Sequence, residues 1–423
     1  MILIRIDEIR TWLKYFFVLI TVHVLFVYFI KNIGGFGINS FAYVLIKMWK
    51  EIVLLILLSL FAYVHRSSAI KLNALDAMIL LFVLIGITYT IVAPNKVPAI
   101  WSFRSIYEIF AFYLLGRFYF LKKMDLTDFL KALVIMGCLT SIFAVVQVQF
   151  LGADFFSEVY GVDEVPIAYS SHGYENLRAP STFITPHEFG LFLVLCFMFA
   201  SYLFKTDRYS KKSFVFINVL LLIGLAFSLS RSSILILIIC YGLYWVRNKK
   251  TTFGFLILCV FGALVLYLIG VAENISSVIE GEDPSSMGRF VVFREFLNHM
   301  QNHPLGSGLG TIGVVVRRFI PNAPQFEGEL FNIFGMMGIA GGLGYVLILA
   351  YVILKNWLIS FRSNHINRHY YQMVAIIVIA LTLRELILPR DFTNYSIGWF
   401  LIGSSISLIS YKQMKSSVKF VKT

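Results

Sequence analysis

The sequence predicts an all-α polytopic membrane protein, a single transmembrane domain over residues 1–423 with about twelve membrane-spanning helices. Three observations favour this class. Hydrophobic residues make up 59% of the chain and charged residues only 14%, whereas soluble domains carry roughly 25% charge. The apolar residues form separate blocks of roughly 17 to 25 residues, long enough to cross a hydrocarbon core of about 30 Å as helices. Most Lys and Arg residues lie in alternate gaps between these blocks, as in cytoplasmic loops.

The predicted spans follow one another with mostly short connections. In the first half of the chain they lie at 11–30, 51–64, 75–93, 101–120, 129–151 and 186–204, and in the second half at 213–229, 230–246, 253–271, 330–357, 371–388 and 395–411. Basic residues precede the first span and no small-residue cleavage site follows it, so we expect it to remain as a helix.

Orientation follows from the basic residues. An even number of spans places both termini on one side, and the positive loops place that side in the cytoplasm. Two larger loops, residues 152–185 and 273–329, then lie on the outer face. In the second loop Phe290, Phe293, Leu297 and Met300 recur at helical spacing, which predicts an amphipathic helix on the outer membrane surface.

Several function classes are excluded or disfavoured. The four cysteines lie inside apolar blocks without metal-ligand spacing, and the net charge of +13 comes from loop residues rather than a nucleic-acid-binding surface. His299 and His303 have the spacing of a metal-ligand pair, but no third ligand accompanies them. No phosphate loop, dinucleotide fingerprint or nucleophile elbow is present. We therefore expect no metal and no cofactor, and a substrate that arrives already activated.

Charged residues gather at the predicted outer face, where each needs a partner or a function. Arg231 joins two apolar runs with almost no loop, and its forked, permanent charge suits a phosphate; the alternative is an arginine that contacts lipid headgroups. Glu327 and Glu329 precede a span, where a general base reaches a substrate at the membrane surface. Alternatively, they are solvated acids that balance Arg317 and Arg318.

Further candidates for substrate binding lie at the same face. Arg178 and His187 flank the start of the span at 186–204, with ordinary loop residues as the alternative. Arg384 follows the same logic, but an ion pair with the adjacent Glu385 is the alternative. The full set of predicted binding residues is Arg178, His187, Arg231, Arg289, Arg317, Arg318 and Arg384.

Four stretches in a fixed order carry a family resemblance that covers most of the chain. They are Arg-Ala-Pro-Ser-Thr-Phe-Ile-Thr-Pro-His-Glu-Phe-Gly at 178–190, Ser-Leu-Ser-Arg-Ser-Ser at 228–233, Gly288-Arg289 followed by His-Pro-Leu-Gly-Ser-Gly-Leu-Gly at 303–310, and Gly-Met-Met-Gly-Ile-Ala-Gly at 335–341. The chain resembles the O-antigen ligase and polymerase superfamily of bacterial polysaccharide assembly.

The resemblance implies a glycosyltransferase C-type architecture and a metal-independent enzyme without cofactor. It implies undecaprenyl-pyrophosphate-linked oligosaccharides as substrates, at the periplasmic face of the bacterial inner membrane. Arg178, Arg231 and Arg289 would contact the pyrophosphate, and Glu327 or Glu329 would activate the acceptor hydroxyl. Membrane lipids and a chain-length regulator are the other expected partners.

One departure bears on the reaction. Ligases of the superfamily usually carry a His-Asn pair about eleven residues before the glycine that matches Gly338, and this chain has Glu327-Gly-Glu329 there. The resemblance therefore favours a polymerase of lipid-linked repeat units. Two alternatives remain: an O-antigen ligase that transfers glycan to the lipid A core, and a flippase or transporter of lipid-linked sugars, which would show charges at the membrane midplane and inverted repeats.

Overall fold

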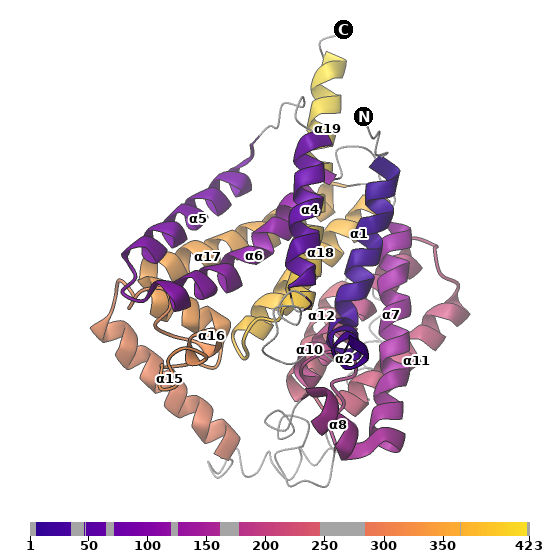
Figure 1. Cartoon of the computed structure of the whole chain (residues 1–423). Helices are drawn as coiled ribbons and strands as arrows, with labels where there is room; N and C mark the ends of the chain where they lie inside the picture. The colour runs from indigo at the N-terminus through magenta and orange to yellow at the C-terminus, as the bar shows by residue number, and fades with distance from the viewer. Residues whose placement is uncertain are drawn as a thin grey trace. The chain divides into compact units, whose positions relative to one another are not determined.

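The computed structural model describes residues 6–34, 46, 48–64, 72–119, 126–160, 177–245, 284–363 and 365–420. All regular elements in these ranges are helices, which confirms the all-α class (Figure 1). Five helices are long and apolar enough to cross a membrane, or six if one bent pair forms a single span. The predicted span at 253–271 lies outside the described residues, so the total of about twelve spans stays a prediction.

The described helices follow the predicted spans closely. The five long apolar ones are α5 (Ala74–Val92), α7 (Thr127–Val146) with the π-helix η1 (Gln147–Leu151), α10 (Pro186–Lys205), α11 (Lys211–Ser228) and α17 (Glu329–Arg362). The remaining elements are α1 (Ile6–Thr21), α2 (His23–Gly34), α4 (Trp49–Val64), α6 (Lys96–Tyr119), α8 (Gly152–Tyr160), α12 (Arg231–Trp245), α15 (Pro284–Asn302), α16 (Val314–Arg317), α18 (His365–Glu385) and α19 (Phe392–Phe420).

The chain divides into two compact units, which are described separately. Unit 1 comprises Met1–Ser67, Phe118–Tyr241 and Ser407–Thr423, and unit 2 comprises Ser68–Arg117 and Gly242–Ile406.

Unit 1 is built around α10. Almost every residue of this helix is buried, because α7 and α11 pack against it and against each other. Small residues permit the close approach: a side chain at Gly137 would meet Cys196, and one at Gly224 would meet Ser141. Close helix contacts through small residues are typical of membrane proteins, where van der Waals packing drives helix association. The interior of this unit is therefore a packed helix bundle.

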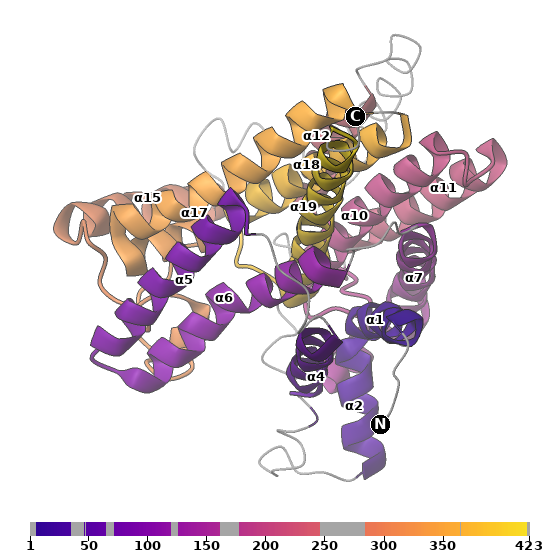
Figure 2. The ribbon, with the colours of Figure 1, turned by 90° about the horizontal axis from the view of Figure 1, so that it is seen from above.

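The first predicted span is not one straight helix. Instead α1 and α2 meet at an angle of 80°, and Figure 2 shows α2 leaving the end of α1 in a new direction. Side chains hold the bend: Trp49 Nε1 donates to His23 Nδ1 at 2.8 Å, and the Tyr28 hydroxyl donates to Glu158 on α8. Neither Pro nor Gly marks the break, but Thr182 Oγ1 donates to the Thr21 carbonyl at the break itself, as is typical where a side chain enters the hydrogen-bond ladder of a helix.

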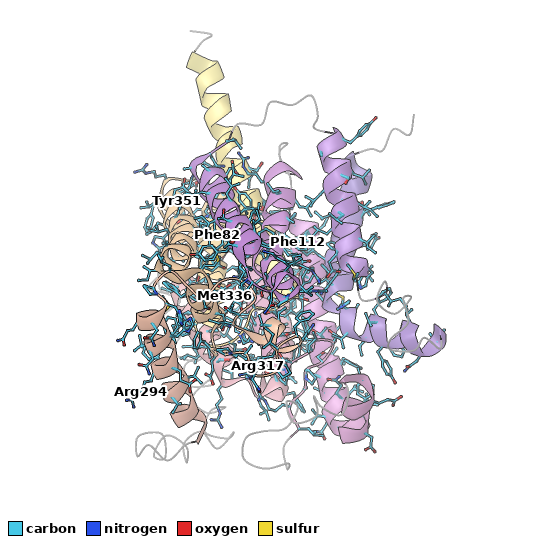
Figure 3. The ribbon with its side chains drawn as sticks, turned by 60° about the vertical axis from the view of Figure 1, so that its left-hand side comes forward. Phe82, Phe112, Arg294, Arg317, Met336 and Tyr351 are labelled. Carbon is cyan, nitrogen blue, oxygen red and sulfur yellow. The ribbon has the colours of Figure 1, made fainter. Side chains whose placement is uncertain are left out.

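Unit 2 is centred on α17, which packs against α5, α15 and α18. Aromatic rings fill the contact with α5, where Phe82 stacks on Tyr345 with ring centroids 5.7 Å apart. On the described part of α15, Phe296 packs inward: it is 8% exposed, and its ring centroid lies 4.8 Å from that of Phe331. The predicted apolar face of α15 did not include Phe296, and its members Phe293 and Leu297 remain exposed. In Figure 3, Arg294 points away from α15 and Met336 lies in the interior of this unit.

Candidate functional site

A buried loop leads the chain into α10 in unit 1. Ala179, Ser181 and Thr182 are almost fully buried. Hydrogen bonds to neighbouring helices fix this loop, since Gln147 Nε2 donates to the Ser181 carbonyl at 2.8 Å and the Ala179 N–H donates to the carbonyl of Phe227, which lies on α11, at 2.9 Å. Residues on either side of the loop are thereby held in place.

The start of α10 follows from the local sequence. Thr185 caps the helix, with Oγ1 accepting the Glu188 N–H at 3.2 Å, and Pro186 occupies the first turn. Threonine as the capping residue and proline in the first turn are both favoured at a helix N-terminus. His187 is therefore fixed at the beginning of a buried helix, close to the loop residue Arg178.

We call five neighbouring residues of unit 1 the arginine cluster: Arg178, His187, Ser228, Ser230 and Arg231. Arg178 Nε donates to the Ser228 carbonyl at 3.4 Å, and Arg178 Nη2 lies 3.3 Å from His187 Nε2. His187 Nδ1 lies 3.0 Å from Ser230 Oγ. The structure thus brings together three predicted binding residues that are up to 53 positions apart in the sequence (178 to 231).

The electrostatics of the cluster are unusual for arginine. Burial, followed by the positive charge of Arg231, lowers the pKa of Arg178 to about 10. Arg178 still carries its charge at neutral pH, so two like charges are held near each other. An anion with two or more negative charges would relieve this repulsion.

Arg178 keeps hydrogen-bonding capacity for such an anion. A guanidinium has five N–H donors, and two of those of Arg178 go to Ser228 and His187. The other three, two on Nη1 and one on Nη2, have no recorded acceptor among the described residues. Nη1 and Nη2 together form the outer fork that binds a phosphate in bidentate fashion.

Helix α12 begins at Arg231, two residues after Leu229, whose positive φ of 47° ends α11. Among the described residues, Arg231 acts on Arg178 through its positive charge. The N-terminus of α12 adds partial positive charge at the same place. This part of unit 1 has the chemistry of an anion-binding site.

Glu327 and Glu329 lie in unit 2, on either side of a tightly packed glycine. A side chain at Gly328 would come within 2.6 Å of the Glu385 carbonyl oxygen, so the backbone of the two segments is in close contact. The Glu329 N–H donates to the Leu388 carbonyl at 3.4 Å, and Glu329 is the first residue of α17. Both carboxylates are half-buried.

A buried ion-pair cluster of Tyr345, Glu385 and Arg390 lies in the same unit. Arg390 Nε donates to Glu385 Oε1 at 2.7 Å, Arg390 Nη2 donates to the Tyr345 hydroxyl at 2.9 Å, and the Tyr345 hydroxyl donates to Glu385 Oε1 at 2.9 Å. Burial opposes the charge of Arg390, but the negative charges of Glu385 and Glu329 contribute to raising its pKa above the usual value. Glu385 therefore has its ion pair with Arg390 and not with the adjacent Arg384, which had been considered from the sequence.

The glycine-rich loop 303–310 closes a break in α17. Gly338 has a φ of 68°, which interrupts the helix and would leave carbonyls of the preceding turn unpaired. The Ser307 N–H donates to the Gly335 carbonyl, and the Gly308 N–H donates to the Met336 carbonyl, both at 2.9 Å. The hydroxyl of Tyr89 on α5 donates to the Leu305 carbonyl of the loop at 2.6 Å and lies 3.2 Å from the Met337 carbonyl. The glycine-rich loop therefore supplies hydrogen-bond donors to the carbonyls at the break in α17.

The other predicted binding residues are placed as follows. Arg317 Nε donates to the Ala323 carbonyl at 3.0 Å and so fastens its own loop, and Arg318 is exposed. Arg384 is buried at 2% exposure and contributes to the electrostatics of Asp391. The backbone of Arg289 belongs to α15, but its side chain lies outside the described residues.

No group of three metal-ligating side chains occurs in the described part of the chain. His299 and His303 lie side by side with ring centroids 4.8 Å apart, and burial lowers the pKa of His299. His299 Nε2 contacts the Gly335 carbonyl at 3.2 Å, next to the bond from Ser307. The spacing of these histidines thus serves the packing of α15 on α17.

Sequence reasoning did not identify every participant of these clusters. Ser230 was read only as part of a motif, although it is fully buried and contacts His187. Tyr345 was not singled out, and Arg390 was placed at the outer face without a partner, although its side chain is only 4% exposed. A charge at the end of an apolar span needs a partner, and Glu385 is five residues away.

Comparisons with known proteins agree with this architecture. Residues 216–346 match the family model described as O-Antigen ligase. The match begins in α11, includes Arg231, Glu327 and Glu329, and ends in α17 beyond its break at Gly338. An O-antigen polymerase of Salmonella muenchen is 22% identical over 303 residues, which cover 67% of this chain and 75% of the relative.

The described part of the chain is helical with several apolar spans, and this architecture together with the matched domain resembles that of the membrane proteins of O-antigen assembly. The family resemblance is thereby supported: the chain is similar to the O-antigen ligase family over residues 216–346 and to an O-antigen polymerase over two thirds of its length.

Proposed function

We propose that this protein is a polymerase of undecaprenyl-pyrophosphate-linked oligosaccharide repeat units. It transfers the growing glycan from its lipid carrier to a hydroxyl of the next lipid-linked unit, at the periplasmic face of the bacterial inner membrane. Both termini lie in the cytoplasm, and the two loops at 152–185 and 273–329 lie outside. A chain-length regulator and membrane lipids are its expected partners.

The arginine cluster of unit 1 is the observation that carries this proposal. Arg178 and Arg231 hold two like charges together, and among the described residues three N–H donors in the outer fork of Arg178, two on Nη1 and one on Nη2, remain for an anion. Pyrophosphate is the leaving group of a polyprenyl-linked donor. Two fixed arginines can therefore bind it and stabilise the negative charge that develops as the glycosidic bond breaks, without a divalent ion.

The acceptor hydroxyl needs a general base, and Glu327 or Glu329 takes this role in the proposal. Gly328 holds this turn tightly against the backbone of Glu385 and Leu386, which fixes both carboxylates at the start of α17. Arg289, Arg317, Arg318 and Arg384 are retained as further glycan or pyrophosphate contacts. Among them Arg317 has a structural bond to Ala323 and is the weakest candidate.

Two observations help to distinguish a polymerase from a ligase. The relative from Salmonella muenchen is an O-antigen polymerase, and this chain has Glu327-Gly-Glu329 where ligases usually carry His-Asn. The family model, however, is described as O-Antigen ligase, so ligase is the second candidate. It shares the lipid-linked donor with the polymerase and differs in the acceptor, the lipid A core.

Deleting the gene in its host separates the two candidates. If the protein is the polymerase, surface polysaccharide on a gel shows core with a single repeat unit, because ligation still works. Complete loss of attached repeats, with lipid-linked polymer accumulating, would identify a ligase.

Complementation of the same strain then tests the residues. We expect Arg178→Ala to lower polymer formation by about 100- to 1,000-fold, as does removal of one donor to a developing oxyanion in other enzymes. The double variant Glu327→Gln/Glu329→Gln removes both candidate bases and should abolish polymer. The exposed Arg294→Ala on α15 serves as a control. Wild-type polymer from Arg178→Ala or from the double variant, at normal expression, would refute the corresponding role.

A further inference from the structure

The contact between Arg178 and His187 determines where the imidazole carries its proton. A guanidinium offers only N–H donors and remains protonated at neutral pH, so it cannot accept a hydrogen bond. Because Arg178 Nη2 lies 3.3 Å from His187 Nε2, that ring nitrogen is the acceptor. The neutral ring then carries its proton on Nδ1, which donates to Ser230 Oγ at 3.0 Å.

Serine side chains continue this directed chain into α12. Ser230 Oγ accepts from His187, and its own hydroxyl hydrogen has Ser233 Oγ as an acceptor at 2.8 Å. The backbone N–H of Ser230 donates to Ser228 Oγ at 3.3 Å, and both serines are fully buried. The position of Ser230 is therefore fixed, and with it the orientation of the imidazole.

Helix α10 and the first turn of α12 approach each other closely at this contact. Gly190 lies three residues after His187, and a side chain there would come within 2.6 Å of Ser233 Oγ. Without a side chain at Gly190 the N-terminus of α12 can approach α10 closely enough for Ser230 to reach His187. The histidine thus lies in a helix crossing, between Arg178 and the serines.

We propose that His187 is a positioning residue that acts through Arg178. In its neutral form with the proton on Nδ1, it holds Arg178 through Nη2 while the Ser228 carbonyl holds Nε, so that the outer fork of the guanidinium faces the pyrophosphate. This inference rests on the proposed function and deepens it. It replaces the direct contact between His187 and substrate that the sequence had suggested.

Protonation of His187 would disturb the position of Arg178. Protonation of His187 at Nε2 removes the acceptor for Arg178 and adds a third positive charge beside Arg178 and Arg231. Arg178 contacts His187 directly, Arg231 follows its hydrogen-bond partner Ser230 in the chain, and Glu188 is the next residue of α10. Activity should therefore fall on the acid side as His187 gains a proton.

Two variants separate positioning from bulk structure. In His187→Gln the amide oxygen reaches the place of Nε2 and can accept from Arg178, whereas in His187→Asn the shorter amide reaches only Ser230. The full-length protein in lipid nanodiscs is assayed for polymer formation from lipid-linked repeat units extracted from the deletion strain. Loss of a hydrogen bond to a charged group corresponds to about a 10- to 100-fold loss of kcat/KM for the donor, expected for Asn, against about 2- to 10-fold for Gln.

The pH profile is the second readout. Wild type should lose more activity on the acid side than His187→Gln, because the amide takes up no proton in this range, whereas protonation of the candidate base Glu327 or Glu329 affects both proteins alike. Equal losses in the Gln and Asn variants, or the same acid-side loss in wild type and His187→Gln, would overturn the positioning role. Failure of the proposed function looks different: wild type forms no polymer in this assay, or Arg178→Ala forms as much as wild type.

Discussion

Arg178 in unit 1 and Arg390 in unit 2 are both removed from solvent to a large degree, but their surroundings differ in charge. Arg390 donates to a carboxylate at 2.7 Å and to a tyrosine hydroxyl at 2.9 Å. Arg178 has a carbonyl, an imidazole and a second arginine as neighbours. As a result the pKa of Arg390 is raised, while that of Arg178 is lowered to about 10.

This difference in neighbouring charge indicates different roles for the two arginines. A buried arginine whose charge is matched within the protein stabilises that part of the fold once it has formed. A buried arginine beside another cation costs stability, and such a cost is typical of sites that bind or react with a ligand. Burial alone would have placed the two residues in one class.

The largest expected effect comes from breaking the matched pair. Arg390→Met leaves Glu385 charged or protonated in a site with 1% exposure, and we expect a loss of about 3 to 5 kcal/mol in the free energy of unfolding. Thermal unfolding of the purified protein in detergent measures this loss. Arg390→Met/Glu385→Leu removes both charges and should recover a large part of it. An unchanged melting temperature for Arg390→Met would contradict the distinction between the two arginines.

The second prediction gives Arg178 the kind of partner that Arg390 has. His187→Glu places a carboxylate beside the guanidinium, so the melting temperature should stay the same or rise. Polymer formation should fall by about 100-fold or more, because the arginine charge is then neutralised within the protein. The matched control is His187→Gln, which differs from the Glu variant by one charge. Equal activities of these two variants would show that the unmatched charge of the cluster is not needed.

The third and smallest effect concerns the backbone of unit 2. Gly338→Ala requires a left-handed conformation and brings a methyl group within 2.3 Å of the backbone of Leu305, so we expect a loss of at least about 1 to 2 kcal/mol in stability. Gly344→Ala lies in the same helix, meets only a ring carbon of Phe82 at 3.7 Å, and should be neutral or stabilising. If both variants unfold at the same temperature, the break in α17 is not held by the glycine-rich loop.

Local sequence signals predicted the helices well. The start of α10 could be read from Thr185-Pro186, since capping depends on residues within one turn. The bend between α1 and α2 could not be read, because its apolar run is continuous and the contacts at the bend come from Trp49 and Glu158, far away in sequence.

Prediction of the candidate site was limited in the same way. The residue types and their common face were accessible from the sequence, so Arg178, His187 and Arg231 were all placed at the outer face, and the structure brings them into one cluster. The partner of Glu385 was not accessible. Adjacent residues of a helix point in different directions, whereas Arg390 lies beyond the helix end and reaches back to the carboxylate.

The bonds between the glycine-rich loop and α17 also determine an order of events during biosynthesis. The loop is synthesised before the helix that it caps, by about 30 residues, so it is available when the segment around Gly338 enters the membrane. In hydrocarbon an unpaired carbonyl costs several kcal/mol, and a broken helix cannot wait there for a partner. The break in α17 can therefore form as the helix inserts, whereas in the reverse order of chain segments the helix would have to insert unbroken and be opened later.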